Sequence, residues 1–114
     1  MSRRLPLLLL LLAGCSKGPQ ADLQYIGEAR SIAGEWALVN EQAADGKLTG
    51  PYIATMHKSL RQQIETAKAA LTVPDSAYAH EMATLVATPD NAPPQELRHH
   101  ADRLKQIEDS LESA

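Results

Sequence analysis

The stretch TGPYIATMHKSLRQQIETAKAAL, residues 49–71, decides the fold class, because its apolar side chains recur at steps of three and four residues. That spacing puts one face of an α-helix against a core, formed by Ile53, Met56, Leu60, Ile64, Ala67 and Leu71. Thr49 can cap this helix, and Pro51 suits its first turn, where backbone amides have no intrahelical partner. We expect the opposite face to be solvated, with Lys58, Arg61, Gln62, Glu65 and Lys68.

A second helix is predicted before this one, starting with Asp22 as its N-cap. Its apolar positions also follow helical spacing, and they include Tyr25, Ile32, Trp36, Val39 and Ala43. The Asp45-Gly46 pair can form a hairpin turn, but its flanks do not alternate, so we expect Gly46 in the left-handed conformation that ends helices. Gly27 and Gly34 lie seven residues apart on one face, where another helix can approach closely.

Two further helices are predicted toward the carboxyl end. A short one begins at Pro74-Asp75 and ends near Ala87, with Tyr78, Met82, Leu85 and Val86 facing inward. After the turn-rich connector TPDNAPPQ, residues 88–95, Pro93 and Pro94 can begin a helix in which Leu97, Leu104 and Leu111 recur every seven residues. Short connections favour antiparallel neighbours. We therefore predict an all-α fold, a small antiparallel bundle of three to four helices over residues 22–114, with three if residues 74–92 are irregular.

Composition agrees with one small helical domain. The chain has 114 residues, no Phe, and an apolar fraction dominated by Ala and Leu, which favour helix over strand. Its net charge is −3, and from Cys15 onward 9 basic side chains stand against 14 acidic ones, a net charge of −5. Nucleic-acid-binding domains are usually basic, so no nucleic-acid partner is expected.

Residues 1–14 have the layout of a secretory signal peptide. Arg3 and Arg4 precede an apolar run from Leu5 to Ala13, and small residues follow before Cys15, which is the only cysteine of the chain. A transmembrane helix needs about 20 apolar residues, so this run is too short to span a bilayer. One cysteine also excludes an intramolecular disulfide.

The tetrapeptide Leu12-Ala13-Gly14-Cys15 resembles the lipobox of bacterial lipoproteins, a resemblance that covers the first 15 to 20 residues. It implies cleavage before Cys15 and a diacylglycerol thioether on that sulfur, and two or more acyl chains anchor a protein stably to a membrane. Residues 15–21 then read as the lipidated cysteine and a flexible polar tether. In enterobacterial lipoproteins a Ser at the position of Ser16 implies the outer membrane, which we favour over the inner one. The alternative is an ordinary cleavable signal with an accidental cysteine, or a short buried amphipathic start to the chain.

Candidate metal ligands are poorly placed in the sequence. The segment EQAADGKLTGPY, residues 41–52, resembles a calcium loop, but Ala43 and Tyr52 occupy two positions that must supply oxygen ligands. The histidines are His57, His80, His99 and His100, and we expect them at helix surfaces, with Met56 and Met82 filling the core. No metal or cofactor is expected. The alternative is a haem- or metal-binding bundle that uses His99 or His100 with Met56 or His57.

No set of residues suited to catalysis is visible in the sequence. The serines lie in helical contexts without a nucleophile-elbow motif, at positions 31, 59, 76 and 110. Glu108, Asp109 and Glu112 read as solubilising charge on an outer helix face, and Trp36 as a core residue, with an exposed anchor for a partner as its alternative. We therefore expect a non-enzymatic periplasmic lipoprotein of the cell envelope, membrane-bound through Cys15, that acts as an interaction or accessory protein for an envelope partner.

Overall fold

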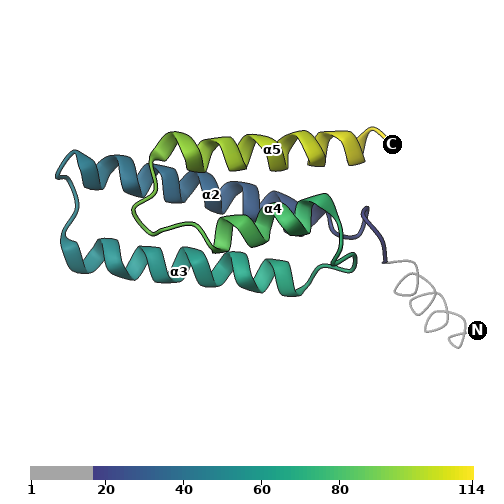
Figure 1. Cartoon of the computed structure of the whole chain (residues 1–114), viewed down its shortest axis with the longest axis horizontal. Coiled ribbons are helices and arrows are strands. Elements are labelled where there is room, and N and C mark those ends of the chain that lie inside the picture. Colours follow the sequence, from purple (N-terminus) through teal and green to yellow (C-terminus); the bar gives the residue numbers. More distant parts are fainter. Residues whose placement is uncertain (1–16) are drawn as a thin grey trace, which may run out of the picture.

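A computed structural model describes residues 17–114, which form four α-helices and no strand within that range. The helices are α2 (Leu23–Ala44), α3 (Gly50–Ala69), α4 (Ala77–Val86) and α5 (Pro94–Glu112). Figure 1 shows α2 and α3 as an antiparallel pair, α5 lying along α2, and the short α4 in front, between α3 and α5. The predicted all-α bundle is confirmed, in its four-helix form. No helix of the described part is long and apolar enough to cross a membrane.

The helix ends follow local sequence signals. The side chain of Thr49 accepts a hydrogen bond from the backbone N–H of Tyr52 at 3.3 Å, and Gly46 has a φ of 70° after α2. Both features were predicted from the sequence. The helix α4 begins at Ala77 rather than at Pro74-Asp75, because the hydroxyl of Ser76 caps it by accepting the N–H of Ala79 at 3.2 Å.

The core is formed by the apolar stripe of each helix around α2, which packs against α3 and α5 while α4 closes the space between them. Trp36 is fully buried, as predicted. The other large side chains with no exposed surface are Ile26, Leu60, Ile64, Met82, Leu85, Leu97 and Leu104. The seven-residue repeat of α5 is therefore a true packing seam at its first two leucines, and Leu111 is partly buried against it.

Asp22 has a different role from the predicted one. The helix α2 does begin after it, but its side chain makes no capping hydrogen bond. Instead the carboxylate is fully buried and accepts hydrogen bonds from the backbone N–H groups of Thr72 and Val73, at 2.9 and 3.2 Å, and from the hydroxyl of Tyr78, at 2.6 Å. Asp22 thus joins the start of α2 to the connection between α3 and α4.

The segment before α2 is held against the bundle. The backbone N–H of Gly18 donates to Oγ1 of Thr72 at 3.0 Å, and the side-chain amide of Gln20 donates to the carbonyl of Leu111 at 2.8 Å. Residues 15–21 were expected to be a flexible tether, whereas positions 18 and 20 are fixed by these bonds. Gly18 and Gln20 are therefore bonded to the bundle although they precede α2.

The two glycines inside α2 differ in their surroundings, which allows a matched test. A Cβ at Gly34 would meet nothing within 4 Å, whereas a Cβ at Gly27 would lie 2.9 Å from Oε2 of Glu108 in α5. The predicted close approach therefore occurs at Gly27 only, and through a side chain. We expect Gly34→Ala to raise the free energy of unfolding by about 0.8–1 kcal/mol in urea titrations, since alanine is the better helix former. Gly27→Ala should gain less, because Glu108 must move; an equal gain in both variants would contradict this packing.

Candidate functional site

The predicted lipidation residue, Cys15, lies outside the described residues. The structure does show where the chain that follows it enters the fold. Gly18 and Gln20 contact Thr72, in the connection after α3, and Leu111, near the end of α5. An attachment at Cys15 would therefore join the bundle at the end where α2 begins and α5 finishes (Figure 1).

Two of the four histidines, His57 and His100, depart from the expected surface position. His57 is buried, with 8% of its surface exposed, and its Nε2 lies 2.7 Å from Oδ1 of Asn40. His80 and His99 are exposed, as expected. His100 is partly buried and pairs through Nδ1 with Glu81, which also forms an ion pair with Arg103 at 3.1 Å. Met82 is a core residue, as expected, whereas Met56 is only partly buried and packs against the core from its edge.

The candidate metal ligands are not brought together. Within residues 17–114, no group of three or more His, Cys, Asp or Glu side chains is arranged to hold a metal ion. Met56 and His57 lie on α3, whereas His99 and His100 lie on α5, and these two helices do not pack against each other in the described bundle. The pairing that the haem or metal alternative requires is therefore not formed.

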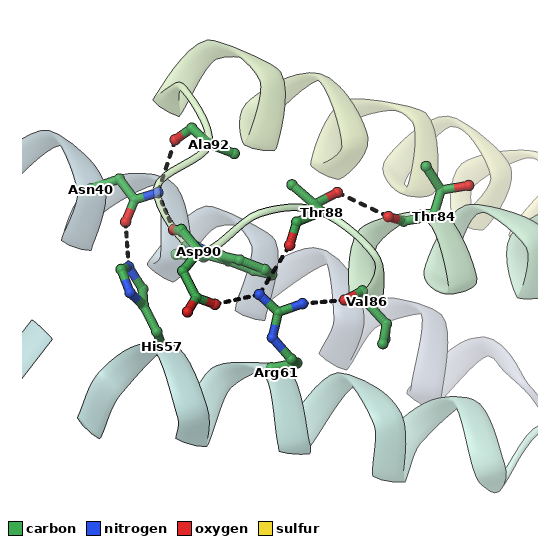
Figure 2. Close-up of polar contacts among 9 residues, drawn as sticks. Asn40, His57, Arg61, Thr84, Val86, Thr88, Asp90 and Ala92 are labelled. Carbon is green, nitrogen blue, oxygen red and sulfur yellow. Dashed lines mark hydrogen bonds and ion pairs between the residues drawn. The ribbon is translucent and has the colours of Figure 1, made fainter. Parts of the chain in front are cut away.

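A partly buried polar cluster holds the connection between α4 and α5 in place (Figure 2). The side-chain amide of Asn40 donates to the carbonyls of Asp90 and Ala92, at 2.9 and 2.8 Å, and the indole N–H of Trp36 donates to the same Asp90 carbonyl at 2.9 Å. These bonds attach residues 90–92 to α2. The sequence did not indicate this role for Asn40, because its partners lie 50 and 52 residues away.

Arg61 belongs to this cluster and not to the solvated face on which it was expected. Its guanidinium donates to the carbonyls of Val86 and Thr88 and to the carboxylate of Asp90, and its central carbon lies 4.9 Å from the ring centroid of Trp36 (Figure 2). Within the described residues, no buried side-chain nitrogen or oxygen lacks a hydrogen-bond partner. A fully satisfied cluster of this kind fixes one packing arrangement, so we assign it a structural role.

The carboxylates of α5 also divide between two roles. Asp109 and Glu112 are exposed, as expected, and Asp109 pairs with Lys105 one turn away at 3.2 Å. Glu108 was expected to be solubilising charge, but its side chain is only 16% exposed and accepts from Nε of Arg30 at 2.8 Å. That ion pair joins α5 to α2.

An open groove between α2 and α3 has a volume of about 730 Å³. We call it the α2–α3 groove. The α2 wall carries the carboxylates of Glu28 and Glu35, and the α3 wall carries hydroxyl and amide groups from Ser59, Gln63 and Thr66. Two of the four serines considered as nucleophiles line the groove, Ser31 on the α2 wall and Ser59 on the α3 wall.

A second hollow of about 180 Å³ continues the α2–α3 groove toward the loop that joins the two helices, and Glu35 lines both. It contains Leu38 and Tyr52, which are 48% and 50% exposed and are the large apolar residues most open to solvent in the described chain. The sequence did contain a signal for this surface. On α2 the lining residues 28, 31, 35 and 38 recur at steps of three and four, a second helical stripe beside the core stripe.

Comparison with known proteins adds no relative: the chain matches no protein-family model, no curated protein and no solved structure.

Proposed function

We propose that this protein is a bacterial lipoprotein, held on the periplasmic face of an envelope membrane by lipid on Cys15, and that its bundle acts by contact with another envelope protein. The observation that carries the proposal is the lipobox-like Leu12-Ala13-Gly14-Cys15 at the end of an apolar leader. The two acyl chains of a diacylglycerol on the sulfur, with or without a third chain on the α-amino group of Cys15, supply enough buried hydrocarbon for stable anchoring of a folded domain. Ser16 favours the outer membrane over the inner one.

The start of the folded part supports an arrangement close to the membrane. Gly18 is already bound to the bundle, so only three residue steps separate it from Cys15. An extended chain of that length spans at most about 10 Å. A lipid on Cys15 would therefore keep the end of the bundle near Thr72 and Leu111 against the headgroups, and the sides of the helices would face the periplasm.

The lipid anchor is tested by replacing Cys15, which removes the sulfur that would carry the lipid. We expect the parent protein to enter the detergent phase in detergent partitioning and to carry acyl chains on an amino-terminal Cys15 in mass spectra. Cys15→Ala should yield no acylated species and should leave an uncleaved leader, since the lipoprotein signal peptidase requires the modified cysteine. Ser16→Ala is the matched control and should keep both the lipid and the cleavage. An unmodified amino terminus in the parent would disprove the anchor.

The contact part of the proposal is tested separately in intact envelopes. An amine-reactive crosslinker applied to cells should join the full-length protein to a different envelope protein, giving a discrete heavier species. If only the monomer is recovered, while mass spectra show the lipid, the anchor stands and the interaction role fails.

A further inference from the structure

The α2–α3 groove and the hollow that continues it run lengthwise along the two helices. Their lining residues lie between positions 27 and 42 on α2 and between positions 52 and 66 on α3, which is about 20 Å along each helix axis. The helix α4 packs on the side of α3 that carries Glu65 and Lys68, whereas the groove wall uses Ser59, Gln63 and Thr66 on its other side. The bundle therefore covers one side of the α2–α3 pair and leaves the other open.

The charges of the groove that form no ion pair in the described chain are negative. Glu28 and Glu35 lie seven residues apart on α2, about two turns or 10 Å along the helix axis. The cation that also lines the groove, Arg30, is engaged by Glu108 at 2.8 Å. Within residues 17–114, no lysine or arginine forms an ion pair with Glu28 or Glu35. The groove therefore offers two carboxylates to a cationic ligand.

One end of the groove is apolar. Leu38 and Tyr52 lie opposite each other beside the α2–α3 loop, and each is about half exposed. Half-exposed large side chains gathered at the end of a groove are typical of a protein-contact surface, where they anchor a partner's apolar residues.

We propose that the α2–α3 groove binds a lysine- or arginine-rich amphipathic helix of a partner protein, an inference that rests on the proposed contact function. A helix laid between two antiparallel helices packs its side chains into their shared groove at about 8–10 Å between axes. Two cations of the partner, seven residues apart, meet Glu28 and Glu35, and its apolar residues meet Leu38 and Tyr52. The net charge of −5 after the leader adds attraction for a cationic partner and repels an acidic one.

The location is tested by photocrosslinking in the cell with the full-length protein. The photoreactive residue p-benzoylphenylalanine replaces either Gln63, in the groove wall, or Lys58, an exposed residue of α3 outside it. We expect a product from position 63 and none from position 58. Sequencing the crosslinked peptide by mass spectrometry should identify a Lys/Arg-rich helical segment of another protein. A second copy of this chain, an acidic segment, or no product from position 63 would each overturn the proposal.

The charge requirement is tested in the same assay. The double variant Glu28→Gln and Glu35→Gln keeps the side-chain size and should lower the yield from position 63 by about tenfold, equivalent to about 1.4 kcal/mol of binding free energy. Glu65→Gln with Glu112→Gln is the matched control and should leave the yield unchanged. Equal loss in both double variants would overturn the assignment to the groove. A crosslink found by the amine-reactive reagent but absent from position 63 would refute the groove and leave the proposed function in place.

Discussion

Replacing Trp36 by alanine should lower the free energy of unfolding by about 4 kcal/mol, since truncating a buried Trp typically costs about 3–5 kcal/mol. The indole has no exposed surface and lies in the core stripe of α2. Its N–H binds the carbonyl of Asp90, and its ring lies under the guanidinium of Arg61. The substitution therefore opens a cavity and also removes contacts that hold the α4–α5 connection.

Chemical denaturation followed by circular dichroism measures this loss, and Tyr52→Ala is the control. Tyr52 is an aromatic residue that is 50% exposed, so its replacement should change stability by no more than about 0.5 kcal/mol. Trp36→Phe keeps much of the volume and should fall between the two. Similar small losses in Trp36→Ala and Tyr52→Ala would mean that Trp36 is not at the centre of the core.

The helices and the core could be predicted from the sequence because the signals for both are local. The periodic apolar positions of residues 49–71 identify α3, and Thr49 and Gly46 mark the helix ends where the structure has them. Trp36 falls on the buried stripe for the same reason. Spacing along one helix determines which side chains share a face, and a face with many apolar residues must be covered.

The polar contacts between helices could not be predicted in this way. Arg61 lies on the polar side of α3 by its spacing, and only the later connection that crosses it turns it into a hydrogen-bonded group. Glu108 similarly gains its partner from α2, 78 residues away. Helical periodicity gives a residue's direction from its own axis, but it does not say which other segment lies there.

The groove was missed for a related reason. Glu28 and Glu35 share a face with polar and small residues, which is also the pattern of an ordinary solvated surface. What distinguishes this surface is that the groove walls of α2 and α3 face each other while the rest of the bundle lies elsewhere. That arrangement depends on where α4 and α5 pack on α2 and α3, and therefore on tertiary structure.

Replacing Asp22 by alanine should lower the free energy of unfolding by about 3 kcal/mol, because hydrogen bonds to a charged group contribute about 1.5–3 kcal/mol each and are not additive. The change leaves the hydroxyl of Tyr78 and the N–H of Val73 without their acceptor. Asp75→Ala is the control, since that aspartate is exposed in the same connection and its loss should have little effect. Comparable stabilities of the two variants in urea would show that the buried carboxylate is not needed to fix the start of α2.

Asp22 and its partner Tyr78 make the stability of the fold depend on pH, Asp22 at acid pH and Tyr78 at alkaline pH. Burial raises the pKa of Asp22, but the hydrogen bonds from Tyr78, Thr72 and Val73 outweigh it and hold the pKa below its ordinary 3.8. The ionised form therefore contributes its stabilisation above about pH 4, and this is lost as pH falls through the depressed pKa. Burial and the bond to Asp22 raise the pKa of Tyr78 to about 12, so its neutral form stabilises the fold fully below pH 10 and ceases to do so as pH passes 12. We expect the stability difference between the parent and Asp22→Asn to shrink below pH 4, and we expect Tyr78 to ionise near pH 12 in ultraviolet titration. A difference that stays constant down to pH 2 would contradict the role of the charge.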